Sequence, residues 1–186
     1  LDETMQALDD LVTQGKIRYI GCSNLPSWQV VESQWLSKSM GLNRFVSCQD
    51  EYNILNRDVE SELIPAMQKY GCGLLPYFPL ASGLLTGKYK RTEMPEGARL
   101  TDMPTFANRI YLTDENFDIV DRLKKFANKT GHSILELAFS WMASRPTTAS
   151  IIAGATKPEQ IDANVAAINW VLSQSEIDEV DKISAR

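Results

Sequence analysis

The sequence predicts an α/β fold assembled from parallel strand–helix units. Four short apolar runs are typical of buried strands, and each is followed by a segment with helical periodicity. Strands joined through helices in this way pair in parallel, and such sheets are buried on both faces. The loops after the strands are polar and carry glycine. We therefore expect functional groups at the carboxyl ends of the strands.

The first half of the chain contains two of these strands and three helices. One helix ends at Gly15, because this residue terminates a segment with an apolar stripe. A strand over Ile17–Cys22 follows, and the residues after it suit the start of a helix that ends near Gly41. Phe45–Gln49 is β-branched and aromatic enough for a buried strand, and a helix is expected over Asp58–Tyr70.

The second half contains the other two strands. The third strand is expected over Gly73–Leu80 and the fourth over Ala149–Ala153. Between them lies a long irregular segment, Tyr89–Leu112, and a loop of that length is usually functional or mobile. The remaining helices are indicated by their periodicity and start residues: Asp114–Lys129, a helix opened by the capping box Ser133–Glu136, one that starts at Thr156–Glu159, and one capped by Ser173–Glu176.

Length, composition and charge limit the class of protein. With 186 residues, of which 44% are hydrophobic, we expect a single domain over residues 1–186 with one core. A net charge of -5 argues against nucleic-acid binding, and no apolar run approaches the length of a membrane span. The chain opens with an amphipathic helix rather than a secretory signal, so a cytoplasmic location is expected.

Cysteine and histidine usage gives little support to a metal centre. Cys22, Cys48 and Cys72 are odd in number and widely spaced, which argues against a disulfide framework and a zinc site. Cys22 and Cys48 lie in strand-like runs and are interpreted as small buried apolar groups, with a reactive role as the alternative. His132, which lies just before a helix cap, suits a structural or surface role better than catalysis.

The stretch from Tyr77 to Tyr89 is the most informative loop. A buried strand opens here into small residues and glycines, and α/β proteins place anionic cofactors at such points. Gly83 and Gly87 permit close backbone approach, and Lys88 adds a positive charge. The stretch resembles a P-loop, but its first spacing is one residue short and Tyr89 replaces the required Ser or Thr. An ordinary strand-to-loop transition is the alternative.

The predicted strand ends bring amide and hydroxyl side chains to one rim. Ser23, Asn24 and Gln49 can donate to and accept from a carboxamide, and Tyr77 can stack on a flat ring. The helix that begins after Gly154 favours an anion at its N-terminus. Together these ends suit a nicotinamide at one end and phosphates at the other. Simpler interpretations are a helix cap for the Ser-Asn pair, a solvated strand end for Gln49 and a core position for Tyr77.

Four motifs follow one another along the chain: Gly15–Asn24, Gln49–Leu55, Tyr77–Tyr89, and Gly154–Gln160 with Asn164. These motifs and their order resemble those of the aldo-keto reductases, specifically their C-terminal half. The similarity covers essentially the whole chain and, in motif, favours the bacterial and potassium-channel β-subunit-like branch. It implies a (β/α)8 TIM barrel, of which this chain would supply strands 5–8 and the helices after them.

The resemblance also implies a cofactor, NADP(H), that lies extended across the carboxyl ends of the strands. Ser23, Asn24 and Gln49 would hold the nicotinamide carboxamide, and Tyr77 would stack on its ring. The ribose and pyrophosphate would be wrapped by Phe78, Pro79, Leu80, Ala81 and Ser82, with Lys88 reaching a phosphate and Arg99 closing over the cofactor. The adenosine 2′-phosphate and adenine site is matched by Gly154, Thr156, Lys157, Gln160 and Asn164, and cations there favour NADP over NAD.

Two departures from the family pattern matter. Phe78 stands where a Ser is common, which removes a hydroxyl near the pyrophosphate. The family's catalytic Asp, Tyr, Lys and His belong to the first half of its barrel, so no catalytic residue is assigned within this chain. Four strands cut from a closed barrel leave two edges and an uncovered apolar interior. We therefore expect part of a longer chain, with the N-terminal half-barrel as its partner, and inactivity of the 186 residues alone.

The expected function is the NADP-dependent reduction of small aldehydes or ketones to alcohols. The first alternative is a non-catalytic, NADPH-binding regulatory subunit of the channel β-subunit type. The second is a half-barrel that pairs with itself as a homodimer.

Overall fold

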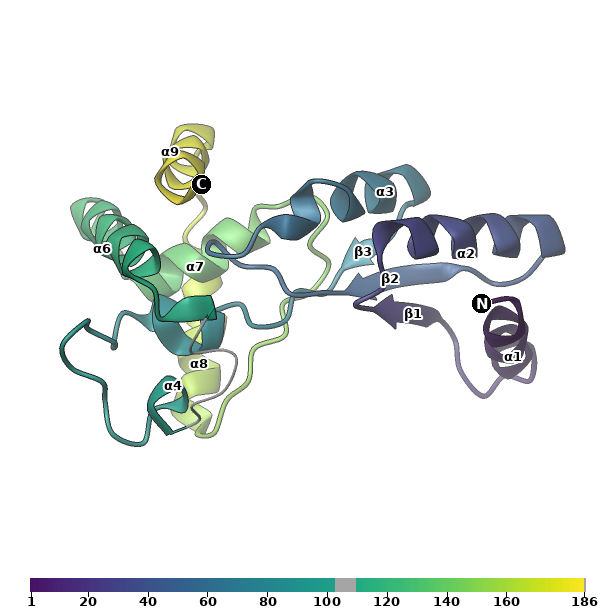
Figure 1. Cartoon of the computed structure of the whole chain (residues 1–186), viewed down its shortest axis with the longest axis horizontal. Coiled ribbons are helices and arrows are strands. Elements are labelled where there is room, and N and C mark those ends of the chain that lie inside the picture. Colours follow the sequence, from purple (N-terminus) through teal and green to yellow (C-terminus); the bar gives the residue numbers. More distant parts are fainter. Residues whose placement is uncertain (103–109, 186) are drawn as a thin grey trace. The chain divides into compact units, whose positions relative to one another are not determined.

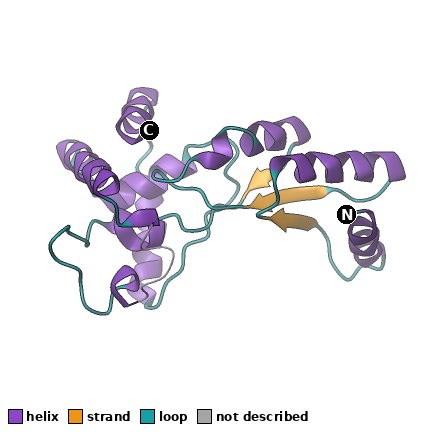
Figure 2. Cartoon of the chain, in the orientation of Figure 1, coloured by secondary structure: helices purple, strands orange, loops and turns teal. Residues whose placement is uncertain are grey.

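The computed structural model describes residues 1–102 and 110–185. By their contacts these residues form two compact units. Unit 1 comprises Leu1–Glu51, Asp58–Tyr77 and Pro146–Ser150, and unit 2 comprises Tyr52–Arg57, Phe78–Arg145 and Ile151–Arg186. Figure 1 labels the elements of both units, and Figure 2 separates helices from strands by colour. The chain is α/β, as predicted.

Unit 1 is built on a parallel sheet of three strands in the order β1-β2-β3. The strands are β1 (Ile20–Ser23), β2 (Phe45–Gln49) and β3 (Gly73–Leu74). They alternate with the helices α1 (Asp2–Thr13), α2 (Ser27–Met40) and α3 (Leu63–Tyr70), and a 3-10 turn covers Asp58–Glu60. The contacts of α2 with both α1 and α3 form a helical layer beside the sheet (Figure 1). The parallel strand–helix alternation of the first half is confirmed.

Strand lengths are where the sequence interpretation fails. The second strand has the predicted bounds, whereas the first begins at Ile20 and extends through Ser23. The third is only two residues long, although the N–H groups of Leu75 and Tyr77 still donate to the carbonyls of Cys48 and Asp50. An isolated parallel bridge between Glu51 and Tyr77 continues its pairing.

The fourth strand, predicted over Ala149–Ala153, is wrong. The segment makes a single parallel bridge, from Thr148 to Leu74, and Leu74 exchanges backbone hydrogen bonds with Thr147 and Ala149. The next hydrogen bond on this edge would need the N–H of residue 76, which Pro76 lacks. Pro76 thus ends the pairing of this segment after Ala149.

The core of unit 1 lies between α1 and the sheet. Met5, Ile20 and Phe45 are buried together, and partly buried apolar side chains pack against them: Leu8, Val12, Ile17, Cys22, Leu25 and Leu42. The predicted apolar stripe of the first helix is therefore its inner face. Helix α2 buries three polar residues besides Val30, and the side chain of one of them, Gln34, donates to the Phe45 carbonyl at 3.0 Å.

The start of α3 shows the effect of a proline. The helix predicted over Asp58–Tyr70 begins only at Leu63, after the 3-10 turn. Pro65 is the third residue of α3, and the first turn is the part of a helix where a missing N–H costs nothing.

Unit 2 is helical. Its elements within the described residues are a 3-10 segment η2 (Ala81–Thr86), α4 (Arg99–Asp102), α6 (Asp114–Lys129), α7 (Ile134–Ala143), α8 (Pro158–Ala166), η3 (Ala167–Asn169) and α9 (Gln174–Ser184). Both predicted capping boxes are present: Ser133 with Glu136 at α7, and Ser173 with Glu176 at α9. The irregular segment Tyr89–Leu112 contains α4, and its residues 103–109, with Pro104, lie outside the described residues.

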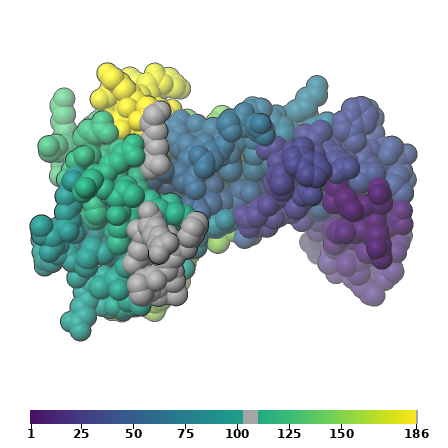
Figure 3. All heavy atoms as spheres, viewed as in Figure 1, coloured from purple at the N-terminus to yellow at the C-terminus, as the bar shows by residue number. Residues whose placement is uncertain are grey.

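Trp141 of α7 forms the centre of unit 2. It is fully buried, and the ring of Tyr52 lies 5.3 Å from it between centroids. Its indole nitrogen donates to Asp181 of α9 at 2.8 Å. Helix α9 thus docks through a polar contact, while its outer residues face solvent (Figure 3, yellow). None of the helices in the described ranges is long and apolar enough to cross a membrane.

Candidate functional site

Four of the predicted site residues meet at the carboxyl ends of the strands in unit 1. Ser23 and Gln49 are register partners across β1 and β2, and the Ser23 hydroxyl donates to the Gln49 carbonyl at 2.8 Å. The Asn24 side chain donates to the Ser23 hydroxyl at 2.9 Å. The Tyr77 hydroxyl donates to the Asn24 Oδ1 at 2.7 Å. The sheet register therefore assembles residues that lie up to 53 positions apart in the sequence.

Asn24 is held in an unusual conformation at this point. Its φ is 55°, in the left-handed region that few residues other than glycine adopt. Its backbone N–H donates to the Gln49 carbonyl at 3.3 Å, and its side chain is fixed at both the amide nitrogen and the oxygen. Strain that is held by surrounding contacts is typical of functional sites. The arrangement presents an oriented amide, a hydroxyl and an aromatic ring to a planar polar group.

Carboxylates lie close to this group. Burial raises the pKa of Tyr77, and the neighbouring charges of Glu51 and Asp50 raise it further. The phenol is therefore kept protonated and keeps donating to Asn24. Burial also raises the pKa of Asp50, which is 7% exposed.

The turn after Tyr77 is a second strained segment, in unit 2. Phe78, Ala81 and Ser82 all have positive φ, between 48° and 55°, and Gly83 follows at 99°. Backbone hydrogen bonds fix the turn, from the Ala81 N–H to the Phe78 carbonyl at 2.9 Å and from the Gly83 N–H to the Leu80 carbonyl at 2.8 Å. Three non-glycine residues of this kind within positions 78–82 indicate that the backbone shape itself is needed.

Two predicted cations border this turn. The Arg99 guanidinium lies 5.2 Å from the ring centroid of Phe78, and the Lys88 ammonium lies 5.2 Å from that of Tyr89. The structure thus brings Phe78 and Arg99 together, as a cation that closes over the turn requires. Phe78 has no hydroxyl to offer a phosphate, but its ring gives Arg99 a cation–π partner.

The remaining predicted residues lie at the start of α8. Gln160 reaches back, and its Oε1 accepts from the Thr156 N–H at 2.7 Å. Lys157 is the N-cap residue of the helix, and its side chain makes no capping hydrogen bond. Asn164 lies one turn beyond Gln160. Gly154 precedes the helix, and a Cβ built on it would meet nothing within 4 Å. The helix start is open and exposed, with a positive charge at its positive dipole end.

Asn53 is a site residue that the sequence interpretation missed. It is fully buried in unit 2, and its side-chain nitrogen donates to the Phe78 carbonyl at 3.0 Å. Its side-chain oxygen accepts from the N–H groups of Leu55 and Asn56, both at 2.9 Å. Asn53 thereby fixes the first residue of the strained turn. A hydrogen bond from the backbone N–H two residues further on to an Asn side chain forms an Asx turn. The sequence Asn-Ile-Leu-Asn was the only sign of this turn in the sequence.

Among residues 1–102 and 110–185, no group of three or more potential ligands could hold a metal ion. His132, predicted to be structural, stacks on Trp170 with 4.0 Å between ring centroids, and its Nδ1 lies 3.1 Å from Glu136.

Comparison with known proteins gives a match over nearly the whole chain. A sequence model of the Aldo/keto reductase family matches residues 1–185. A probable voltage-gated potassium channel subunit beta of Oryza sativa subsp. japonica is 38% identical over 189 residues, which cover 100% of this chain and 57% of that protein. An NADH-specific methylglyoxal reductase of Escherichia coli is 33% identical, over 94% of this chain and 51% of that protein.

A putative aryl-alcohol dehydrogenase of Schizosaccharomyces pombe is 35% identical, over 95% of this chain and 49% of that protein. The chain therefore spans about half the length of the curated relatives it matches.

Proposed function

Because the chain belongs to the aldo/keto reductase family, in its potassium-channel β-subunit-like branch, we propose that it is the cofactor-binding part of an oxidoreductase that reduces aldehydes or ketones with NADPH. The observation that carries the proposal is the hydrogen-bonded group of Ser23, Asn24 and Tyr77 at the strand ends. A fixed amide beside a fixed hydroxyl fits the donor and acceptor pattern of a carboxamide.

The nicotinamide end of the cofactor is assigned to unit 1. Asn24 and Ser23, with Gln49, would hold the carboxamide, and the Tyr77 ring would lie against the nicotinamide. When bound, the cofactor supplies the hydride. The residues of this chain orient its ring, and the Tyr77 phenol keeps the Asn24 amide turned so that its nitrogen points to Ser23.

The phosphate end is assigned to unit 2. The strained turn of Phe78–Ser82 would follow the ribose and pyrophosphate, with Lys88 and Arg99 supplying positive charge. At the start of α8, Lys157 and the helix dipole suit a 2′-phosphate, whereas Thr156 and Gln160, with Gly154 and Asn164, suit the adenosine. This charge supports NADP over NAD. One relative from Escherichia coli is named as an NADH-specific reductase, so the preference of this chain for NADP or NAD has to be tested.

The fit is tested by fluorescence titration with NADPH and NADH in the full protein that carries this chain. Loss of a charge-assisted contact costs about 1.5–3 kcal/mol, so Lys157→Ala should weaken NADPH binding by about 10- to 150-fold. NADH binding should stay unchanged, because NADH has no 2′-phosphate. Lys182→Ala, on exposed α9, is the matched control. Equal effects of Lys157→Ala on both cofactors would contradict the assignment.

Tyr77→Phe tests the nicotinamide end. It removes the donor to Asn24 and keeps the ring, so binding of both NADPH and NADH should weaken by about 2- to 12-fold. If both affinities stay unchanged, the Tyr77 hydroxyl has no orienting role.

The proposal places the catalytic groups outside this chain, in an N-terminal half of a (β/α)8 barrel that this chain completes. Carbonyl reduction is then expected only when both halves are present, which coexpression of the two halves and an NADPH oxidation assay with a nitrobenzaldehyde would test. Turnover by the 186 residues alone would contradict it. The proposal includes a cytoplasmic location, for which subcellular fractionation is the test.

A second candidate is a regulatory subunit that binds NADPH and docks to a membrane channel. The identity of 38% to a protein named as a potassium channel subunit favours it. Copurification with a membrane protein, together with NADPH binding and no turnover across a broad carbonyl panel, would select this function. Homodimerisation of the 186 residues, measured by sedimentation, would instead support a self-pairing half-barrel.

A further inference from the structure

Three cysteines gather in the sheet of unit 1. Cys22 of β1 and Cys48 of β2 are register partners, and their sulfur atoms lie 3.5 Å apart. Cys72, which comes directly before β3, is hydrogen-bonded to Cys48 on the other side. The carbonyl of Phe45 and the side chain of Gln34 each lie 3.3 Å from the Cys72 sulfur. The parallel register, not the sequence spacing, creates this row of thiols.

The three thiols differ in access. Cys22 is partly exposed, whereas Cys48 is 0% and Cys72 is 6% exposed. A reagent from solvent therefore meets Cys22 first, with Cys48 directly behind it.

Their hydrogen bonds also make the thiols chemically unequal. The hydrogen bond with Cys48 lowers the pKa of Cys22, because it stabilises the Cys22 thiolate. The same bond and the one with Cys72 raise the pKa of Cys48 well above its usual range, and burial adds to the effect. The hydrogen bond with Cys48 also lowers the pKa of Cys72, to about 7, but Cys72 is buried. Cys22 is thus the member of the row that combines access with a lowered pKa, which are the properties of an oxidant-sensitive thiol.

We propose that Cys22 and Cys48 are a reversible redox pair, which a hydroperoxide converts into a disulfide. The Cys22 thiolate attacks the outer peroxide oxygen, the O–O bond breaks, and a sulfenic acid forms while the alkoxide or hydroxide leaves and takes up a proton. The Cys48 sulfur then attacks the Cys22 sulfur. The S–O bond breaks, the S–S bond forms, and the oxygen leaves as water with the Cys48 proton. Two electrons pass from the thiols to the peroxide.

The strand geometry permits this bond. Neighbouring strands lie about 4.7–4.9 Å apart, which is within the range of Cα separations that disulfides span. The two sulfur atoms must approach from 3.5 Å to a bond length of about 2.05 Å. Cys48 and Cys72 are also in contact, but both are buried, so the first oxidation step favours the Cys22 side of the row.

The pair lies directly behind the proposed nicotinamide contacts. Ser23 follows Cys22, Gln49 follows Cys48, and these two residues are joined by the 2.8 Å hydrogen bond. A disulfide that draws the strands together shifts this pair and Asn24 beside it. Oxidation is therefore expected to weaken cofactor binding, a consequence that rests on the proposed function, whereas the disulfide itself does not.

Tryptic mapping tests the bond, because the three cysteines fall in three different peptides. These are Tyr19–Lys38, Phe45–Arg57 and Tyr70–Lys88. The full protein is treated with dilute hydrogen peroxide, its remaining thiols are blocked with N-ethylmaleimide, and it is digested without reductant. The expected product is Tyr19–Lys38 joined to Phe45–Arg57, which disappears when dithiothreitol is added before blocking.

Other products overturn the proposal. They are a joined pair containing Tyr70–Lys88, a disulfide-linked dimer on a nonreducing gel, Cys22 that ends as sulfinic or sulfonic acid, and unmodified thiols. Cys72→Ala should keep the joined peptide and Cys22→Ser should abolish it. If either variant fails to fold, the mapping of the unsubstituted protein still decides the question.

A second measurement separates this inference from the proposed function. NADPH affinity should fall at least fivefold after peroxide treatment and return with dithiothreitol, while Cys22→Ser should show no change on treatment. An affinity that is unaltered by the disulfide overturns the coupling. A protein that forms the disulfide but binds no NADPH in either state refutes the proposed function and leaves the redox pair standing.

Discussion

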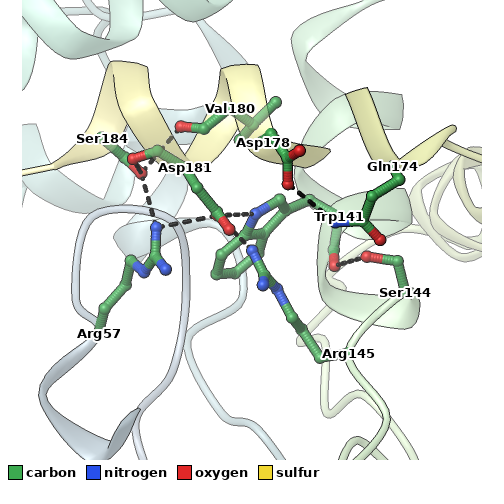
Figure 4. Close-up of polar contacts among 9 residues, drawn as sticks. All are labelled: Arg57, Trp141, Ser144, Arg145, Gln174, Asp178, Val180, Asp181 and Ser184. Carbon is green, nitrogen blue, oxygen red and sulfur yellow. Dashed lines mark hydrogen bonds and ion pairs between the residues drawn. The ribbon is translucent and has the colours of Figure 1, made fainter. Parts of the chain in front are cut away.

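Replacement of Asp181 by Ala should strongly destabilise unit 2. Figure 4 shows the Asp181 carboxylate between Arg57 and Arg145 and beside the Trp141 indole. One oxygen of this carboxylate accepts from Arg57 and Trp141 at 2.9 and 2.8 Å and also from Arg145. Both guanidinium groups lie over the indole, at 5.3 and 4.0 Å from its centroid. Removal of the Asp181 carboxylate leaves the two partly buried guanidinium groups without their shared anion.

The magnitude follows from the exposure of these side chains. Removal of one partner from a fully buried ion pair costs about 3–5 kcal/mol, and an exposed pair contributes about 0–1 kcal/mol. Between 19% and 29% of each charged side chain remains exposed here. The orphaned indole N–H adds to the cost. We therefore expect Asp181→Ala to lower the free energy of unfolding by about 2–4 kcal/mol. Asp181→Asn should cost less, because it keeps an oxygen for Trp141.

Urea denaturation measures this cost, with far-UV circular dichroism as the signal because Trp141 lies at the substituted site. With a slope of about 2 kcal/mol/M, the midpoint should fall by about 1–2 M. Asp178→Ala is the matched control on the same helix. Its carboxylate is exposed and accepts only the Gln174 side chain at 2.8 Å among the contacts drawn in Figure 4, so it should cost less than about 0.5 kcal/mol. Equal midpoints for the two variants would refute the reasoning.

Three further results are expected. Hydrogen bonds from Ser133 lower the pKa of Glu136 below its ordinary 4.5, so this carboxylate stabilises the fold above pH 4.5 and the stabilisation is lost as the pH falls through the lower folded value. Glu136→Gln should therefore lower the free energy of unfolding by about 1 kcal/mol at pH 7 and leave it unchanged in strong acid. Urea midpoints at the two pH values measure this difference, and a loss of stability that is independent of pH contradicts it. Gly73→Ala should cost about 1–3 kcal/mol, because its Cβ would lie 2.8 Å from that of Ala149. An unshifted melting temperature would show that the backbone at Ala149 moves to make room. Alkylation of Cys22 by iodoacetamide, followed by mass spectrometry, should reach half its maximal rate below the ordinary thiol value of about pH 8.5, since its pKa is lowered; a midpoint above that value counts against the thiolate.

Local features were predicted well, and features that need a partner were not. The capping boxes at Ser133 and Ser173 are complete within four residues, so the sequence alone specifies them. The strand Phe45–Gln49 was correct because it lies between two neighbours and buries Phe45 and Cys48. The fourth strand failed because its length depends on a neighbouring edge, where Pro76 has no N–H to continue the pairing.

The candidate site divides in the same way. The residue types at Ser23, Asn24, Gln49 and Tyr77 could be selected from the sequence as donors and acceptors at strand ends. The hydrogen bonds among them, in which Tyr77 orients Asn24, could not be predicted from the sequence, because they depend on the register between strands. The roles assigned to these residues remain predictions.

By itself, the sequence determined the parallel strand–helix alternation of the first half, the capped starts of α7 and α9 and the motifs of the aldo/keto reductase family. Each of these is specified by short stretches of chain. Only the tertiary structure decided which distant side chains meet. Cys22 faces Cys48 across 26 residues, and Arg57 reaches Asp181 across 124. The physical reason is that strand register and helix docking are chosen by the burial of whole faces, so a contact between two polar side chains follows from packing that neither residue specifies.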